Sequence, residues 1–443
     1  MEQAENSGHG DSDRLSSLPD CLIHLIMSFL TAQEAVQTCI LSKRWNNLWT
    51  TSPFLDFDLC KFMCVGKPDD TEWDNTELED ARKITFDKFR DSVSITILLR
   101  ETSDLHKFRL SCKMNDWLDH HMLIRSWILY ALKHNPKVFD INVLPMDSLP
   151  HGAFTCKSLV EASLSAYTSV QTVEVINLPL LKRLHLNGVV LNQGYIDKLF
   201  SGCPVLEFLY LEGFCEEAST IKCQSLKYLK IQCYCLSGDV EKRIKLIDTP
   251  NLLSFCYRTC WNGIGHEMLL KMPSLTHASI YSQRPYKGRS NIVLGLSNIQ
   301  SLKLSGRAIK DLLQNELPNC PDFSNVKELS LNYLYLCYYF NLFANVLDHF
   351  PNLEKLSIQL VGCNIEGELH GKQEPLEIEP FKGTRLQTVE VKFHRSNVCF
   401  PWVMKFLQDF TGRSRPQINI TGLDNWSSQE WDFEISEQVW QHW

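Results

Sequence analysis

The chain has 443 residues, of which 44% are hydrophobic and 22% charged, a balance typical of folded soluble proteins. Its length exceeds what one compact core accommodates, so at least two structural units are expected. Its 52 acidic residues outnumber the 44 basic ones, and the net charge of −8 argues against a nucleic-acid-binding surface.

The N-terminal residues 1–12 are polar, are expected to be disordered and lack the apolar stretch of a secretory signal. No apolar run reaches the about eighteen residues that a membrane span needs, so no membrane partner is expected. The 17 cysteines include no C-x-x-C pair, and without an export signal they indicate reduced thiols in a nuclear or cytoplasmic protein. Cys256, Cys260 and His266 lie close in sequence, but their spacing fits no zinc pattern, so neither a metal nor another cofactor is expected.

Three short helical patterns are packed between residues 17 and 49. Pro19 lies in the first turn of the first helix, and Thr31 and Glu34 form the T-x-x-E capping box that starts the second. Ser42 is placed to cap a third helix. Because the first helix is apolar on more than one face, its surplus apolar surface must pack on the rest of the chain or on a partner.

The letters L-P-D-x-L-I-x-x-I-x-S-F-L from residue 18, and the later I-L-S-K-R-W-N-N-L-W, resemble the F-box, which we place at residues 13–60. In that family the module docks on a Skp-type adaptor, which connects it to a cullin in an SCF-type ubiquitin ligase. The resemblance therefore implies both partners for this chain. The matching positions that become candidate adaptor contacts are Leu18, Pro19, Asp20, Leu22, Ile26, Leu30, Val36, Leu41, Ser42, Lys43, Trp45, Leu48 and Trp49.

Residues 61–135 are expected to form an acidic loop, a helical spacer and an irregular first repeat. The acidic stretch lacks the D-x-D-x-D-G spacing of a calcium loop, so it reads as a solvated loop that enters a helix near 77–92. A second helix is predicted over 120–135, where the apolar residues recur at helical spacing. The letters L-H-K-F-R-L from residue 105 form an irregular first copy of a repeat that recurs further along the chain.

One pattern, apolar-x-x-apolar-x-apolar, recurs through residues 136–395. Its steps of 20 to 27 residues lie within the leucine-rich-repeat period of about 20–29 residues. Each copy reads as a short strand that buries alternate apolar residues, and stacked neighbours must cover that face. The regular copies begin at residues 159, 181, 206, 226, 252, 275, 299, 326 and 353, and a further copy begins at 386.

The predicted fold class is α+β with an α/β solenoid, in which an all-helical F-box precedes an irregular leucine-rich-repeat horseshoe. This combination resembles the plant F-box/leucine-rich-repeat group. The letters R-L-Q-T-V-E-V-K-F from residue 385, followed by a possible helix over 401–411, resemble a shortened FBD region. The C-terminal segment 396–443 is accordingly designated FBD-like.

No complete catalytic motif occurs in the chain. The letters H-E-M-L-L at 266–270 lack the second histidine of H-E-x-x-H, and G-E-L-H-G-K at 367–372 lacks the spacing of a phosphate-binding loop. Neither G-x-S-x-G nor G-x-G-x-x-G is present. We therefore assign no catalytic residue and do not expect an enzyme.

Residues between the inward apolar positions of a repeat strand point to the opposite, concave face of the sheet. Several aromatic and basic side chains fall at such positions in consecutive copies. Aromatic residues and arginine are enriched at the centres of protein interfaces, so this face is the candidate target-binding surface. The candidate residues are Arg183, His185, Phe208, Tyr210, Tyr228 and Lys230.

These features favour the substrate-recognition subunit of an SCF-type ubiquitin ligase. The F-box would hold the adaptor, and the solenoid would hold a target protein for ubiquitination and proteasomal degradation. Catalysis would belong to the partners, and this chain would contribute proximity. Two alternatives stay open: a small-molecule, hormone-like co-receptor of the same architecture with a polar pocket in its concave face, and a scaffold protein outside any ligase.

Overall fold

The chain forms two compact units, Met1–Gly188 and Val189–Trp443. No helix in the described part of the chain is long and apolar enough to cross a membrane. The computed structural model describes residues 14–63, 75–101, 104–113, 120–144, 149–168, 174–215, 220–233, 244–259, 268–282, 293–296, 298–306, 322–334, 347–360, 385–394, 404–405, 407 and 416–423.

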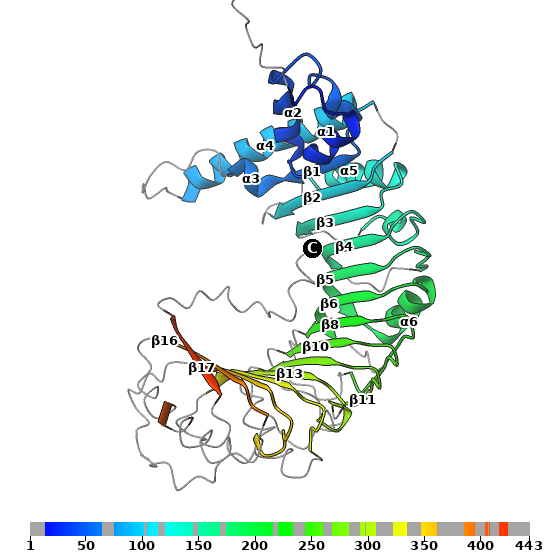
Figure 1. Ribbon diagram of the computed structural model, residues 1–443. Helices are drawn as coiled ribbons and strands as arrows, with labels where there is room; N and C mark the ends of the chain where they lie inside the picture. The colour runs from blue at the N-terminus through cyan, green and yellow to red at the C-terminus, as the bar shows by residue number, and fades with distance from the viewer. Residues whose placement is uncertain are drawn as a thin grey trace, which may run out of the picture. The chain divides into compact units, whose positions relative to one another are not determined.

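The first unit starts with short helices and continues as a parallel sheet (Figure 1). Its α-helices are α1 (Asp20–Met27), α2 (Ala32–Gln37), α3 (Leu59–Met63), α4 (Asn75–Leu99) and α5 (His121–Lys133). Its 3-10 helices are η1 (Thr38–Ile40), η2 (Leu48–Thr51) and η3 (His151–Phe154). Its strands β1 (Phe54–Asp58), β2 (Lys107–Lys113), β3 (Val138–Leu144) and β4 (Glu161–Thr168) pair in parallel in that order, and β5 (Arg183–Leu191) begins in this unit.

Aromatic side chains form the core of the first unit. Phe57, Phe108 and Phe139 lie side by side on β1, β2 and β3, with ring centroids 6.1 and 6.0 Å apart. Helices α4 and α5 meet through Phe89 and Trp127, whose rings lie 6.2 Å apart in an edge contact. Because alternate residues of a strand point to opposite faces, this arrangement leaves the polar residues of β1 to β3 on the other face of the sheet.

The prediction that Ser42 caps a third helix is wrong. Residues 43–47 form turns, and the 3-10 helix η2 begins only at Leu48, with no side-chain cap. The Ser42 hydroxyl instead lies 2.7 Å from the Ser16 hydroxyl and forms a hydrogen bond with it. The hydroxyl is thus engaged by a residue distant in sequence, which a local capping pattern does not reveal.

The other helices and strands predicted for this unit are confirmed, with one addition, whereas the predicted disordered N-terminus and most of the predicted acidic loop lie outside the described residues. The helix predicted over 77–92 is α4, which continues to Leu99, and the helix predicted over 120–135 is α5. The irregular copy predicted from residue 105 is strand β2. Strand β1 was not predicted, because its five residues lie inside the span assigned to the helical F-box.

The second unit is a parallel repeat sheet with a smaller sheet beside it (Figure 1). It contains helix α6 (Gln193–Gly202) and the 3-10 helix η5 (Val293–Leu296). The large-sheet strands are, in order, β6 (Phe208–Cys215), β8 (Tyr228–Cys233), β10 (Ser254–Thr259), β12 (His277–Ser282), β13 (Ser301–Gly306), β14 (Glu328–Leu334), β15 (Lys355–Leu360), β16 (Thr388–His394) and β17 (Gln417–Leu423). The smaller sheet contains β7 (Thr220–Lys222), β9 (Leu246–Asp248) and β11 (Leu269–Lys271).

The repeat pattern places one apolar residue of each strand beside its equivalent in the next strand. Leu209 pairs with Leu229, which pairs with Phe255, and the row continues through Ala278 and Leu302. All five side chains are buried. The predicted strands and their inward apolar positions are therefore confirmed, and so is the fold class of a helical module followed by a repeat solenoid.

Two parts of the second unit were not predicted. The strands of the smaller sheet have three residues each, too few to show a periodic pattern. Strand β17 pairs in parallel with β16, although no strand was predicted within the C-terminal segment 396–443. The helix predicted over 401–411 lies mostly outside the described residues, which include only 404–405 and 407 in helical conformation.

Candidate functional sites

The N-terminal helices enclose a small core of their own. Its buried side chains are Ile23, Met27, Ala35 and Trp45, and the indole ring of Trp45 is only 2% exposed. The partly buried side chains that pack against this core are Leu18, Leu30, Leu48 and Trp49. A core of this size stabilises little by itself, so the hydrogen bonds that join the helices matter to its geometry.

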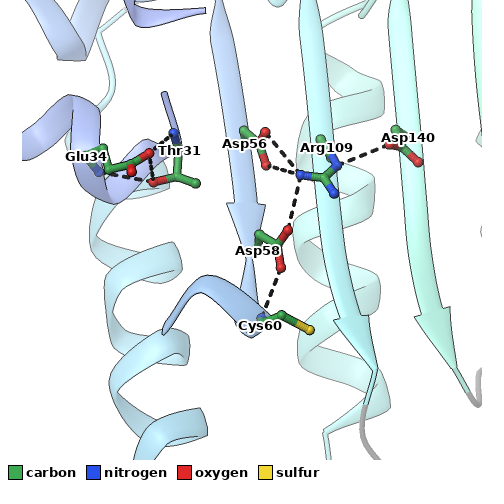
Figure 2. A network of polar contacts seen from close by, with 7 residues as sticks. All are labelled: Thr31, Glu34, Asp56, Asp58, Cys60, Arg109 and Asp140. Carbon is green, nitrogen blue, oxygen red and sulfur yellow. Dashed lines mark hydrogen bonds and ion pairs between the residues drawn. The ribbon is translucent and has the colours of Figure 1, made fainter. Parts of the chain in front are cut away.

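Hydrogen bonds between side chains and backbone fix the turns of this module. The Thr31 N–H donates to the Glu34 carboxylate over 2.7 Å, and the Glu34 N–H donates to the Thr31 hydroxyl over 3.3 Å (Figure 2). The predicted capping box is thus confirmed. Hydrogen bonds from the backbone and hydroxyl of Thr31 lower the pKa of Glu34 and outweigh the opposing effect of burial. His24 joins α1 to η2, because its Nε2 lies 3.2 Å from the Leu48 carbonyl oxygen.

Helix α1 presents a second apolar face that the core does not use. Leu22, Leu25, Ile26 and Phe29 follow the i, i+3, i+4, i+7 spacing of one helix face, and all four are exposed. Phe29, just beyond the helix, is the most exposed of them at 81%. We call these four residues the α1 apolar face. Such a face on a small module is typical of a protein-binding surface.

A second exposed apolar pair follows α2. Ile40 is 85% exposed and Leu41 is also exposed, whereas the preceding Ala35 is buried. Leu25, Phe29 and Ile40 were absent from the predicted adaptor contacts, since those came from motif positions alone. The helical spacing of the apolar residues around Phe29 would have identified the first two.

The predicted adaptor contacts separate into three groups by exposure. Trp45 belongs to the core, so its ring supports the module and offers no surface to a partner. The predicted contacts that are exposed are Pro19, Asp20, Leu22, Ile26, Leu41 and Lys43. Those that are partly buried are Leu18, Leu30, Val36, Ser42, Leu48 and Trp49.

The first strands of the sheet hold a network of carboxylates around one arginine (Figure 2). The Arg109 guanidinium on β2 lies 3.1 Å from Asp56 and 3.3 Å from Asp58, both on β1, and 3.3 Å from Asp140 on β3. Burial opposes the charge of Arg109, but the three carboxylates outweigh burial and raise its pKa. This network joins β1, which follows directly after the helical module, to the first repeats.

The pKa of Asp56 is raised because burial outweighs the attraction of Arg109 and Lys107. A raised folded-state pKa favours the protonated carboxyl, so its contribution to stability is lost as the pH rises through that pKa. We therefore expect the unfolding free energy of the wild type, relative to Asp56→Asn, to fall as the pH rises above about 4. Urea denaturation from pH 4 upward measures this difference.

The exposed Asp91 supplies the control for this experiment. The substitution Asp91→Asn removes the same charge from α4 outside the Arg109 network, and it should not produce the same pH-dependent difference. A wild type that becomes more stable than Asp56→Asn with rising pH would show that the attraction of Arg109 outweighs burial.

The second unit brings four of the predicted target-binding residues together on one face of the sheet. Phe208 and Tyr228 stack in parallel with ring centroids 4.4 Å apart. The Lys230 ammonium lies 4.2 Å from the centroid of the Tyr210 ring, a cation–π contact. The Tyr210 hydroxyl donates to the Glu212 carboxylate over 2.9 Å. We call Phe208, Tyr210, Tyr228 and Lys230 the aromatic patch; all four are partly exposed.

The remaining two predicted residues lie on β5 in the first unit. Arg183 forms an ion pair with Glu161 of β4, with 3.7 Å between the charged atoms. His185 Nδ1 lies 3.3 Å from the Ser163 hydroxyl, also on β4. Both side chains therefore contact the neighbouring strand of their own unit.

The helical module and the parallel repeat sheet define the class of F-box/leucine-rich-repeat proteins. Residues 15–57 match the F-box domain, and residues 132–358 match the family described as "FBD-associated F-box protein At5g56370, LRR repeats". The second match covers just over half of the chain, and the chain belongs to this plant family of F-box proteins with leucine-rich repeats.

Relatives from Arabidopsis thaliana extend the similarity along most of the chain. F-box/LRR-repeat protein At3g59210 is 31% identical over 353 residues, which cover 78% of this chain and 68% of that protein. F-box/LRR-repeat protein At4g14103 is 28% identical over 374 residues, which cover 79% of this chain and 92% of that protein. The F-box/LRR-repeat homologue At3g58880 is 32% identical over 306 residues, but the alignment spans only 63% of its length.

Proposed function

We propose that this protein is the substrate-recognition subunit of an SCF-type ubiquitin ligase. The observation that carries the proposal is the α1 apolar face, which the module exposes although its own core is complete. The match of residues 15–57 to the F-box domain supports a Skp-type adaptor as the partner of this face. The adaptor in turn would connect the chain to a cullin.

The repeat sheet would hold the target protein. The aromatic patch combines stacked rings with a lysine, and large aromatic side chains supply most of the binding energy in many interfaces. In this assignment residues 13–60 would bind the adaptor and residues 136–395 would bind the target, and the FBD-like segment 396–443 has no assigned partner. The described ranges contain nine free cysteines, in keeping with a nuclear or cytoplasmic location.

The chain would contribute no catalytic group of its own. Its role would be to raise the effective concentration of the target lysines at the ubiquitin-carrying partner. Faster ubiquitination of the target would then require that the adaptor is bound at the α1 apolar face while the target is bound on the repeat sheet. It would not require any chemistry within this chain.

Co-expression of the full chain with a Skp-type adaptor and a cullin tests the proposal. The expected result is one complex that contains all three proteins after affinity purification and gel filtration. Purification from plant tissue under proteasome inhibition should also enrich a ubiquitinated partner. A chain that binds the adaptor but never the cullin would instead support the scaffold alternative, and a chain that binds neither would contradict the proposal.

A further inference from the structure

The last strand of the second unit has one open edge. Strand β17 (Gln417–Leu423) pairs with β16 along one side (Figure 1). No other strand in the described part of the chain pairs with its second side. An open edge of this kind presents backbone N–H and C=O groups that another strand can bind.

The hydrogen bonds between β16 and β17 identify which backbone groups are open. The Gln417 N–H donates to the Gln387 carbonyl oxygen over 2.8 Å, so every second residue from Gln417 onward directs its backbone groups toward β16. Ile418, Ile420 and Gly422 lie between those residues and direct their N–H and C=O groups to the open side. We call these three residues the β17 edge.

The inward apolar rows of the repeat sheet also end at the β17 edge. Ile418 follows Val389 and Ile420 follows Val391 in the register between the strands. Both valines are fully buried, whereas Ile420 is 47% exposed. The valines have a strand on each side, but among the described residues the isoleucines have one on only one side. A further strand would therefore bury apolar surface as well as pair the backbone.

The β17 edge lacks the features by which edge strands usually avoid pairing, namely charged side chains, a proline or a bulge. Its strand has seven residues, none of them charged and none proline, and its register with β16 continues without a shift. Strand β1, which begins the sheet of the first unit, is different, because two of its five residues are aspartates. Of these two strands, β17 is the one suited to pairing.

We propose that the β17 edge pairs with the same edge of a second copy of this chain, antiparallel and about a two-fold axis at Ile420. The two copies of Ile420 would lie opposite each other and exchange both of their backbone hydrogen bonds. Ile418 of each copy would pair in the same way with Gly422 of the other. The open backbone groups of the β17 edge would thus satisfy one another.

The side chains favour a second copy as the occupant of this edge. A two-fold axis perpendicular to the sheet keeps the inward faces of both copies on one side, so the isoleucines of each copy extend the apolar row of the other. Because the strand carries no charge, self-pairing brings no like charges together. The same pairing of β1 about its central residue would set two copies of Asp56 opposite each other, which is unfavourable.

A dimer formed by one pair of strands buries a small interface, so its formation should be weak and concentration-dependent. This inference is independent of the ligase proposal, because self-association is measured without adaptor or target. A dimer would carry two F-box modules and two repeat sheets, and would therefore increase the avidity for any partner that offers two binding sites.

Sedimentation velocity on the full chain at about 1–100 µM tests the proposal. The weight-average mass of the wild type should rise with concentration toward that of a dimer. Ile420→Lys and Ile420→Glu each set like charges opposite one another, so each should weaken dimerisation about tenfold or more. An equimolar mixture of the two variants sets lysine opposite glutamate and should restore the dimer. The matched control is Ile84→Lys on α4, where the isoleucine is 56% exposed, and this variant should dimerise like the wild type.

Hydrogen exchange on the wild type provides a second measurement that does not depend on the folding of a variant. The N–H groups of Ile418, Ile420 and Gly422 should gain protection as the protein concentration rises, whereas those of Asn419 and Thr421 should be protected throughout by β16.

A wild type that stays monomeric, without such a gain in protection, would overturn the proposal and leave the edge to another segment of this chain or to a different partner. Dimerisation of Ile420→Lys at the wild-type strength, an equal loss in Ile84→Lys, or a mixture that stays monomeric would also contradict pairing at Ile420.

Discussion

Replacement of Phe29 by aspartate is expected to abolish capture of a Skp-type adaptor while the protein stays folded. Phe29 is 81% exposed at the end of the α1 apolar face, so its ring contributes little to the fold but offers a large apolar contact to a partner. A buried aromatic anchor of an interface contributes about 2 kcal/mol or more, and a charge in its place adds a desolvation cost. Co-precipitation and a titration with purified adaptor would measure the loss.

Leu98 provides a matched control for this experiment. It is 80% exposed at the end of α4, outside the F-box, so Leu98→Asp makes a similar change on a different surface. The control should keep adaptor binding, and both variants should unfold within about 0.5 kcal/mol of the wild type. If Phe29→Asp binds the adaptor as well as Leu98→Asp does, the α1 apolar face is not the adaptor surface.

Leu18 is less suitable for the same test, although the motif places it among the adaptor contacts. Its side chain packs against the core of the helical module, so truncation would combine a loss of folding with a loss of binding. The exposed residues of α1 separate the two effects, because their removal leaves the core intact.

Truncation of Leu209 to alanine is expected to destabilise the second unit by about 2–5 kcal/mol, because it leaves a cavity in the buried row of apolar side chains that crosses the strands. Leu209 is fully buried, with Leu229 as its partner on β8. The neighbouring Tyr210 points to the opposite face, where its hydroxyl bonds Glu212. Tyr210→Ala should therefore cost clearly less stability but weaken target capture by about 2 kcal/mol. Urea denaturation and a capture assay measure the two quantities.

The two variants serve as controls for each other, since they alter adjacent residues of one strand. Equal destabilisation by Tyr210→Ala and Leu209→Ala would mean that the Tyr210 side of the sheet is also part of the core. Unchanged stability and unchanged capture in Tyr210→Ala would leave the aromatic patch exposed but without a role in target binding.

Patterns that are local in the sequence predicted most of the secondary structure. The capping box joins Thr31 and Glu34, which lie three residues apart at the first turn of α2, and the repeat strands show their alternation within a few residues. A repeated alternation also means that each unit needs a neighbour, so the stacking of the strands follows from the same letters. The smaller sheet did not follow, because strands of three residues carry no period.

The candidate sites were predicted less completely than the fold. Motif resemblance named Trp45 as an adaptor contact, but the ring fills the core of the helical module. Phe29, which is far more exposed, was not named. The cause is physical: a short helix that is apolar on two faces does not reveal in its sequence which face turns inward. That choice depends on what the other helices pack against.

The sequence by itself determined which residues of each repeat strand form the inward apolar rows, since alternation along a strand depends only on backbone geometry. Only the tertiary structure decided which side chains become neighbours on the other face. Asp56, Arg109 and Asp140 meet across three strands, and Phe208 and Tyr228 meet across two, through the register between parallel strands. The connections between those strands vary in length, so spacing along the chain does not fix that register, and the packing of the apolar rows does.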